Sequence, residues 1–311
     1  MSFTSNVKNE ITKLELSEIE KISFLSAIIQ NQDLNYNKIK ISTENSSLAR
    51  KIYTILKELY DEVPIITVRK GYNYNKNYIY ILEVKNKIKQ ILNNLGLEFD
   101  NKLRLYPMAY IVDDIDLKRV YLRGLFSICG SINDPKTSRY HLEMSVSNID
   151  YATFISDILN EFHLNSKIIK KDNKYMIYIK EAEKISDFLR IINAINALLY
   201  YEDIRIYRDH KNMTNRLNNC EQANVDKIIF ASNKFLEDVE LLKKYDLIDL
   251  LDEKEKVVIE YRKKYPDASL QELSEIITLE TGTKITKSGL YHRLNKIREF
   301  KEKQEKNINN M

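Results

Sequence analysis

The side chains of this chain that could act on a partner are concentrated near its C-terminal end. Between Lys284 and Lys303 there are seven lysines and arginines against two acidic residues, Glu299 and Glu302, which gives the segment a net charge of +5. The whole chain of 311 residues has a formal net charge of +4. Positive charge gathered in one short segment favours a polyanionic partner such as the phosphate backbone of nucleic acid.

Eight polar residues of this region are candidates for contacts with double-stranded DNA. Leu290, Leu294 and Ile297 recur at helical spacing, so a helix from about Lys287 to Glu302 would bury them on one face. The candidates then remain outside, on this helix and in the turn before it: Lys284, Lys287, Ser288, Tyr291, His292, Arg293, Lys296 and Arg298. A solvated, charged terminal helix without a DNA partner is the alternative interpretation.

The N-terminal end of this helix is the expected phosphate contact. Lys284, Lys287 and Ser288 lie there, where backbone N–H groups and the helix dipole attract anions.

The middle of the helix is expected to contact bases. Tyr291, His292 and Arg293 would face the base edges, and Arg293 has the geometry for two hydrogen bonds to one guanine. Lys296 and Arg298 would neutralise the DNA backbone.

The elements before the cationic helix complete a helix-turn-helix pattern. A first helix, Asp252 to Lys264, should end before Pro266. Ser269 and Glu272 form a capping box that begins a second helix, which continues to Leu279, and the turn after it contains a glycine. Two short helices joined by a glycine-bearing turn, after a supporting helix, are typical of an all-α helix-turn-helix domain.

Other kinds of chemistry find little support in the sequence. Cys129 and Cys220 form no CxxC pair, and the four histidines have no metal-ligand spacing, so neither a zinc site nor a disulfide framework is indicated. Glycine-rich phosphate loops and nucleophile-elbow motifs are missing from the sequence. We therefore expect no cofactor, no metal and no small-molecule substrate.

The first two thirds of the chain contain a repeat. Residues 24–29 have a counterpart in residues 121–126, and the alternating strand pattern of residues 39–45 returns in residues 142–148. In both copies a helix, a hairpin and a closing helix follow. The same elements in the same order, written twice, predict an α+β domain with pseudo-two-fold symmetry and antiparallel sheets.

The first helix of each copy resembles the LAGLIDADG helix of homing endonucleases. The string Leu-Arg-Gly-Leu-Phe-Ser-Ile-Cys-Gly-Ser-Ile at residues 122–132 carries the clearer resemblance, and residues 25–33 form a more degenerate first copy. In that fold the two helices cross closely at the pseudo-symmetry axis. Ala27 and Gly124 are small enough to permit that approach.

The resemblance also indicates which chemistry has been lost. In the active family an acidic residue just before the last glycine of the motif binds the divalent metal used in phosphodiester hydrolysis. Gln32 and Cys129 occupy these two positions, and neither an amide nor a thiol replaces a carboxylate as a magnesium ligand. We interpret Asp33 and Asp134, which lie nearby, as turn residues, with residual nuclease activity as the alternative. No catalytic residue is expected.

The most specific string in the chain joins the two parts. Residues 215–224 read Asn-Arg-Leu-Asn-Asn-Cys-Glu-Gln-Ala-Asn, which is similar to the signature connector of the WhiA family. The pattern Lys-Ser-Gly-x-x-His-Arg-Leu-x-Lys-Ile at residues 287–297 is similar to the recognition helix of that family. The resemblance covers essentially residues 1–303.

The expected domain organisation follows from these observations. A degenerate LAGLIDADG-like domain would occupy residues 1–211, with halves at about 1–100 and 115–205. The remaining segments would be an irregular connector at 212–224 that leads into a long helix (Ala223 to Tyr245), a helical helix-turn-helix domain at 225–303 and a disordered tail at 304–311.

The WhiA resemblance implies a DNA-binding regulator without catalysis, acting in bacterial sporulation, cell division or chromosome segregation as a transcription factor or nucleoid-associated protein. Its partner would be double-stranded DNA, and WhiB-type protein partners occur in one branch of the family. The chain start lacks an apolar signal core, and the longest apolar stretch, 191–201, is too short to span a membrane, so we expect a cytoplasmic, nucleoid-associated protein.

Two other functions stay open. One is a protein-interaction scaffold with weak DNA binding, because Lys38, Lys40, Glu44 and Glu143 give the presumed exposed sheet face a mixed charge. The other is a residual metal-dependent DNA endonuclease.

Overall fold

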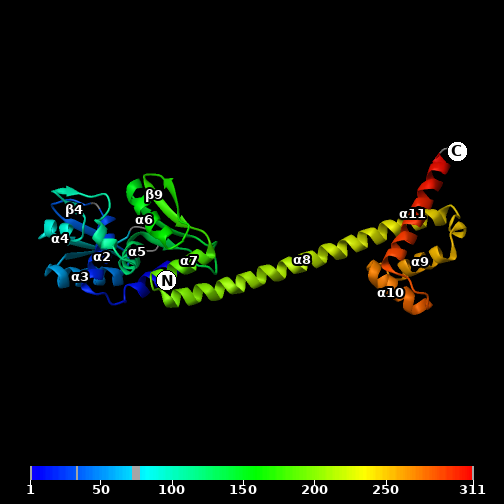
Figure 1. Ribbon diagram of the computed structural model, residues 1–311, viewed down its shortest axis with the longest axis horizontal. Coiled ribbons are helices and arrows are strands. Elements are labelled where there is room, and N and C mark those ends of the chain that lie inside the picture. Colours follow the sequence, from blue (N-terminus) through cyan, green and yellow to red (C-terminus); the bar gives the residue numbers. More distant parts are fainter. Residues whose placement is uncertain (1, 33, 72–77, 310–311) are drawn as a thin grey trace. The chain divides into compact units, whose positions relative to one another are not determined.

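The computed structural model describes residues 2–32, 34–71 and 78–309, and the chain divides into two compact units, residues 1–208 and 209–311 (Figure 1). The first half of the first unit contains α1 (Phe3–Ile11), α2 (Glu18–Gln30), β1 (Ile39–Thr43), α3 (Ser46–Tyr60), β2 (Ile65–Lys70), β3 (Tyr78–Val84) and α4 (Ile88–Asn94).

The second half repeats this order. A short hairpin of β4 (Glu98–Phe99) and β5 (Lys102–Leu103) and the 3-10 helix η1 (Ala109–Val112) lead into it. Its elements are α5 (Ile115–Cys129), β6 (Gly130–Ile132), β7 (Leu142–Val146), α6 (Ile149–Glu161), β8 (Lys167–Lys171), β9 (Lys174–Ile179) and α7 (Ala182–Ile191).

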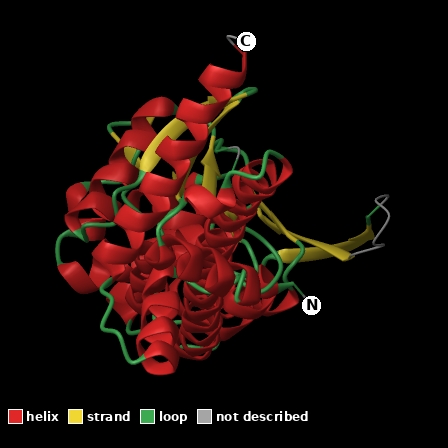
Figure 2. Ribbon diagram, turned by 90° about the vertical axis from the view of Figure 1, so that its right-hand side faces the viewer, coloured by secondary structure: helices red, strands yellow, loops and turns green. Residues whose placement is uncertain are grey.

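The two halves have matching sheets. The first half has the strand order β1-β3-β2 and the second β6-β7-β9-β8, and every neighbouring pair is antiparallel. Strands occur only in the first unit among the described residues. Figure 2 distinguishes these strands, in yellow, from the helices, in red. The prediction of a duplicated α+β domain with antiparallel sheets is confirmed.

The same residue type begins the helix after the first long strand of each half. The Asn45 side chain accepts a hydrogen bond from the backbone N–H of Leu48 at 2.9 Å, and that of Asn148 accepts one from Asp150 at 2.7 Å. Asparagine at the N-cap satisfies a backbone donor that the helix leaves free. These two N-caps start α3 and α6, so the repeat extends to its capping residues.

Helices α2 and α5 pack with their backbones in direct contact. A Cβ atom added to Gly124 of α5 would lie 2.4 Å from the carbonyl oxygen of Phe24 and 3.2 Å from the Cβ of Ala27, both on α2. A distance of 2.4 Å to a backbone oxygen leaves no room for a Cβ atom at this position unless α2 moves. The buried hydroxyl of Ser23 adds a hydrogen bond to the carbonyl of Leu117 at 3.1 Å.

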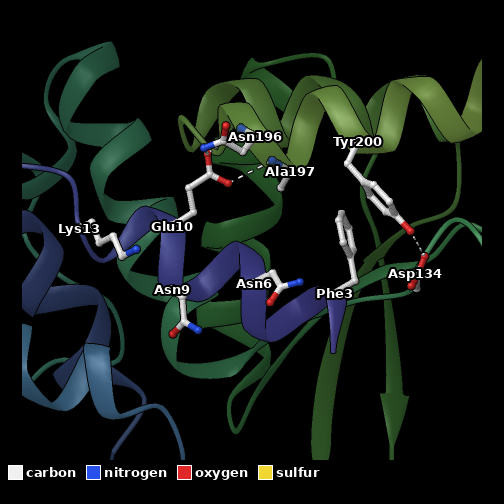
Figure 3. Close-up of a pocket in the computed structure, with 9 residues that line it drawn as sticks. All are labelled: Phe3, Asn6, Asn9, Glu10, Lys13, Asp134, Asn196, Ala197 and Tyr200. Atoms are coloured by element: carbon white, nitrogen blue, oxygen red, sulfur yellow. Dashed lines mark hydrogen bonds between the residues drawn. The ribbon is translucent and has the colours of Figure 1, made fainter. Parts of the chain in front are cut away.

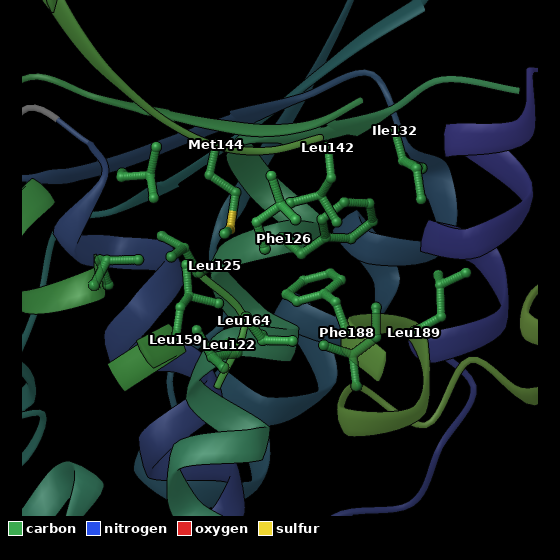
Figure 4. Packing of buried hydrophobic residues seen from close by; sticks show 14 of the residues in the cluster. Leu122, Leu125, Phe126, Ile132, Leu142, Met144, Leu159, Leu164, Phe188 and Leu189 are labelled. Carbon is green, nitrogen blue, oxygen red and sulfur yellow. The ribbon is translucent and has the colours of Figure 1, made fainter. Parts of the chain in front are cut away.

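Each half has its own apolar core, and α2 and α5 contribute to both. The core of the second half includes Ala27 of α2 together with Leu122 and Phe126 of α5. Figure 4 shows the Phe126 ring against Phe188 of α7, with a centroid distance of 5.5 Å. The core of the first half is built on α2 and takes one residue from α5, Val120.

The segment expected to be an irregular connector is helical. Helix α8 runs without interruption from Ile195 to Lys244 and includes residues 212–224. The prediction of irregular structure is therefore wrong here. Asparagine lowers helix propensity only slightly, whereas proline and glycine break helices, and the range 195–244 has neither. The long helix expected from Ala223 is the last part of α8.

The second unit contains the last part of α8, the 3-10 helix η2 (Ile248–Leu250), α9 (Glu253–Lys264), α10 (Leu270–Thr281) and α11 (Lys287–Asn309). Its apolar side chains form two adjoining clusters. One centres on Phe235, Val239 and Ile297, and the other on Val258, Leu273 and Leu290. Helix α11 continues to Asn309, so the expectation of a disordered tail from residue 304 is wrong for residues 304–309.

The contact between α2 and α5 predicts the effect of a single methyl group. The variant Gly124→Ala should lower the free energy of unfolding of the first unit by about 1–3 kcal/mol, because the new Cβ overlaps the Phe24 carbonyl oxygen and α2 must move. Guanidinium unfolding followed by circular dichroism measures the difference.

Gly289→Ala in α11 is the matched control. A Cβ there meets only Thr286 Oγ1 within 3.4 Å, at 3.3 Å, so stability should stay unchanged or rise by up to about 1 kcal/mol. An unaltered transition for Gly124→Ala would show that the two helices do not need this close approach.

Candidate nucleic-acid interface

The turn between α10 and α11 is held by backbone geometry and by two threonine hydroxyls. Gly282 ends α10 with φ +68°, a left-handed conformation, although a Cβ there would meet no atom within 4 Å. Thr278 Oγ1 accepts a hydrogen bond from the N–H of Ile285 at 3.1 Å, and Thr286 Oγ1 accepts one from Gly289 at 3.1 Å. These bonds fix where α11 begins.

The inward face of α11 is apolar, as its spacing predicts. Leu290 and Ile297 are fully buried, and Leu294 packs against both clusters of the second unit. The next residue after Leu290 points outward, since Tyr291 is 53% exposed. His292 is also exposed, with its ring centroid 6.5 Å from that of Tyr291.

Six of the eight sequence-predicted candidates lie in the turn and the first two turns of α11. The exposed ones are Lys284, Lys287, Ser288, Tyr291 and His292, and Arg293 is half-buried. Among the described residues, no carboxylate lies within ion-pair distance of Lys284, Lys287 or Arg293. These cations keep their charge available to an anionic partner.

Lys296 differs from the cations before it, because its ammonium is held by two acids of the helix next to α11. Its Nζ lies 2.9 Å from Asp252 Oδ2 and 2.7 Å from Glu255 Oε1, which flank the start of α9. Hydrogen bonds to these carboxylates raise the pKa of Lys296 to about 12 and lower the pKa of Asp252. Lys296 therefore ties α11 to α9, and we expect less backbone neutralisation from it than its sequence position indicated.

Arg298 is paired as well. Its Nε lies 3.8 Å from Asp238 Oδ2 on α8, and Lys301 Nζ lies 3.1 Å from Asp238 Oδ1. Asp238 is 7% exposed, so two cations of α11 surround one buried carboxylate. Sequence analysis missed these pairs because the acids precede their partners by more than 40 residues. The spacing of Asp252 and Glu255 is typical of a capping box at the start of a helix. It does not indicate that the two side chains also contact α11.

The two positions where active LAGLIDADG proteins carry acids are occupied by neutral groups that have partners inside the protein. Gln32 Oε1 accepts a hydrogen bond from the N–H of Ser42 at 3.4 Å. Cys129 is the last residue of α5, and its thiol donates to the carbonyl of Leu125 at 3.3 Å. Burial raises the pKa of the Cys129 thiol to about 12, so it stays protonated at neutral pH.

Asp134 lies in a turn and lines an open pocket of about 660 Å³ (Figure 3). Its Oδ1 accepts hydrogen bonds from the N–H of Lys136 at 2.8 Å and from the Tyr200 hydroxyl at 3.3 Å. The other carboxylate of the pocket, Glu10, caps the start of α8 by accepting from the N–H groups of Asn196 at 2.7 Å and Ala197 at 3.0 Å. Both acids have structural partners, whereas Asp33 lies outside the described residues.

Two other kinds of feature are not found in the described part of the chain. No three His, Cys, Asp or Glu side chains come close enough together to hold a metal ion. No helix there has the length and apolar composition needed to cross a membrane.

Comparison with known proteins gives one consistent family. Residues 21–98 match the WhiA N-terminal LAGLIDADG-like domain, residues 118–211 the WhiA LAGLIDADG-like domain and residues 214–301 the WhiA C-terminal HTH domain. Proteins called probable cell division protein WhiA from Bacillus mycoides strain KBAB4 and Bacillus cereus strain G9842 are each 41% identical over 309 residues, which is 97% of both chains.

A solved structure also matches over the full length. The crystal structure of full-length DUF199/WhiA from Thermotoga maritima covers 97% of this chain and 99% of its own, with 25% identity and a TM-score of 0.57.

The ion pair of Lys296 predicts a titration change in Asp252. Hydrogen bonding to Lys296 holds the pKa of this carboxyl below its ordinary value of 3.8, so Lys296→Gln should raise it towards that value. NMR titration of the carboxyl carbon measures the shift. A depressed carboxyl pKa stabilises the folded state above the unfolded pKa, and this contribution disappears as the pH falls through the folded pKa.

Lys303→Gln, on an exposed position of the same helix, is the matched control and should leave the titration of Asp252 unchanged. The same Asp252 pKa in both variants would contradict the ion pair.

Proposed function

This chain belongs to the WhiA family, and from that premise we propose that it is a sequence-specific DNA-binding regulator whose reading element is the N-terminal half of α11. The observation that carries the proposal is the division of α11 into a buried apolar face and an exposed face. Leu290 and Ile297 hold the helix against the second unit, while Tyr291 and His292 face solvent beside unpaired cations.

The start of α11 is the proposed phosphate contact. Lys284, Lys287 and Ser288 are exposed around the first turn of the helix, where free backbone N–H groups and the helix dipole favour an anion. Contacts of this kind fix the position of the helix on the duplex and carry no sequence information.

The next turn is the proposed base contact. Tyr291, His292 and Arg293 would lie in the major groove, with the Arg293 guanidinium donating two hydrogen bonds to a guanine. Lys296 and Arg298 would contribute to backbone neutralisation, but their pairing with Asp252, Glu255 and Asp238 reduces what we expect from them.

The first unit is proposed to act without catalysis. The support comes from the two positions where active LAGLIDADG proteins carry metal-binding carboxylates for phosphodiester hydrolysis. Here these positions hold the Gln32 amide and the protonated Cys129 thiol, which are poor ligands for a hard divalent metal. We retain as a proposal the division expected from sequence, a degenerate LAGLIDADG-like domain at residues 1–211 joined through α8 to a helix-turn-helix reader at residues 225–303.

The biological setting is proposed from the relatives. Two of them are called probable cell division proteins, and we propose a role in cell division, sporulation or chromosome segregation, through promoter binding or association with the nucleoid in the cytoplasm. A protein partner of the WhiB type belongs to the same proposal.

A second candidate function, protein docking by the first unit, is favoured by one strand. All six residues of β2 are exposed, and Ile65, Ile66 and Val68 are each about half exposed at 54%, 48% and 52%. Exposed apolar side chains grouped in this way are common at sites of protein interaction.

The base-reading role is tested at Arg293. The variant Arg293→Ala should weaken binding to cognate DNA by about 1–3 kcal/mol and lower the ratio of cognate to random-sequence affinity, because one bidentate contact with a base is removed. Fluorescence anisotropy with both DNAs at several salt concentrations measures it.

Lys296→Ala is the control for Arg293→Ala. It should leave the affinity ratio unchanged and lower the slope of log K against log salt by less than about 0.9, the value for one free phosphate contact. Equal losses of Arg293→Ala on cognate and random DNA would contradict base reading.

The division of labour between the units is tested by truncation. Residues 209–311 should retain most of the salt-dependent DNA affinity of the full chain, and residues 1–208 should retain little of it.

Supercoiled plasmid incubated with the full chain and Mg²⁺ should stay uncut, because the two neutral positions, Gln32 and Cys129, provide no hard anionic ligand. Cleavage that disappears with EDTA would establish the endonuclease alternative instead.

A further inference from the structure

Four helices of the second unit enclose a cavity of about 320 Å³, at the small end of the range of ~300–1,000 Å³ that is typical of ligand pockets. The apolar part of its wall comes from Ile228 and Phe235 on α8, Leu270 on α10 and Leu294 on α11. Tyr291 and Asn295 of α11 complete the wall on the side of the proposed DNA-reading helix.

The charged part of the wall is entirely cationic. Arg262 of α9, Arg298 of α11 and Lys227 of α8 line the cavity, and none of its other lining residues is acidic. Arg298 shares the Asp238 carboxylate, whereas Arg262 and Lys227 have no ion-pair partner among the described residues. A cavity with apolar walls and two such cations is complementary to a ligand that combines an apolar body with a negative charge.

Arg262 is a buried cation without a counter-charge. It is 4% exposed, and its NH1 donates a hydrogen bond to the carbonyl of Ala268 at 2.5 Å. In the described part of the chain no carboxylate lies within 4.0 Å of this guanidinium, although a guanidinium has five N–H donors. Buried charges in proteins are normally paired, because an unpaired charge loses its hydration without compensation.

Two further donors at the cavity lack partners among the described residues. The Ser232 side chain is 3% exposed, and its hydroxyl makes no hydrogen bond there. The Nε of Arg298 is buried without a hydrogen bond, with Asp238 Oδ2 at 3.8 Å. Unsatisfied buried donors beside an uncompensated guanidinium indicate an anionic acceptor that the protein itself does not provide.

We propose that this cavity binds a small organic carboxylic acid, with its carboxylate on Arg262 and the neighbouring donors and a flat or short aliphatic body against Ile228, Phe235 and Leu294. A carboxylate matches a guanidinium through two parallel hydrogen bonds. The apolar wall favours an organic body over inorganic phosphate or the sugar-phosphate backbone of DNA, which would leave that wall without apolar contact. We assign the ligand the role of an effector, since the described lining residues include no histidine, cysteine, aspartate or glutamate that could activate the Ser232 hydroxyl for catalysis.

Binding at this cavity is expected to weaken DNA binding. This step rests on the proposed function, because Tyr291 and Arg298 line the cavity and also belong to the proposed DNA contact. A bound acid draws both side chains towards the cavity. Because ligand binding is measured without DNA, failure of the DNA proposal leaves the test of the cavity intact.

The experiment uses the full chain and isothermal titration calorimetry with two probes, indole-3-acetate and hexanoate. At least one should bind saturably with one site per chain. Indole-3-acetamide and hexanamide keep the same bodies but lose the charge. Their affinity should be lower by a factor of about ten or more, because the charge-assisted hydrogen bonds are lost. Inorganic phosphate should not compete.

Ala231→Trp blocks the cavity from an exposed lining position, where the larger side chain leaves the core untouched. It should abolish binding of the acid, and Arg298→Gln should weaken it. Lys303→Gln, an exposed position of α11 outside the cavity, is the matched control with unchanged affinity. Circular dichroism confirms that each variant is folded.

With the wild type, saturating acid should raise the dissociation constant for cognate DNA about fivefold or more. Unchanged DNA affinity would overturn the effector role. Absence of saturable binding, equal affinity for acid and amide, displacement by phosphate, or full binding by folded Ala231→Trp would each overturn the carboxylate site.

Discussion

The first unit depends on the approach of two backbones where α2 and α5 cross. Gly124 has no Cβ, so its α-carbon can lie against the carbonyl of Phe24, and Ala27 extends the contact with the smallest side chain that still has one. Each of these helices supplies residues to both apolar cores of the unit. A displacement of one helix would therefore disturb the packing of both halves at once, which is why a constraint at one position has consequences across about 200 residues.

This constraint acts on packing and leaves the ends of the helices free to change chemically. Cys129 is five residues beyond Gly124 on α5, yet its thiol needs only a local bond to the Leu125 carbonyl, and Gln32 needs only the N–H of Ser42. An amide and a protonated thiol carry no charge, so neither needs a metal ion or another counter-charge to compensate it. The chemistry of these two positions can therefore differ while the helix crossing is kept.

Patterns that depend on near neighbours in sequence were predictable, and contacts between distant segments were not. The repeat, the capping box at Ser269 and the apolar face of α11 all follow from spacing, and the structure has the corresponding elements. The connector was misjudged because its asparagines resemble a loop in composition, while the absence of glycine and proline over residues 195–244 decided the outcome. The pairing of Lys296 with Asp252 and the unpaired state of Arg262 depend on how helices pack, and no local pattern shows either.

The segment from Lys284 to Lys303, with its net charge of +5, contains two groups of cations in the folded protein. One group is paired with carboxylates of other helices, and the other is not. Three of the four cations in the second half of the segment, Lys296, Arg298 and Lys301, face Asp252, Glu255 and Asp238 on α9 and α8, and only Lys303 has no such partner among the described residues. Those in the first half have no acid near them among the described residues. Because the field of a compensated ion pair falls off faster with distance than that of a single charge, attraction for phosphate concentrates at the start of α11. The paired cations hold α11 against α8 and α9, and the unpaired ones remain available to an anionic partner. Lysines and arginines occur along most of the helix, but those at its start are the ones expected to bind phosphate.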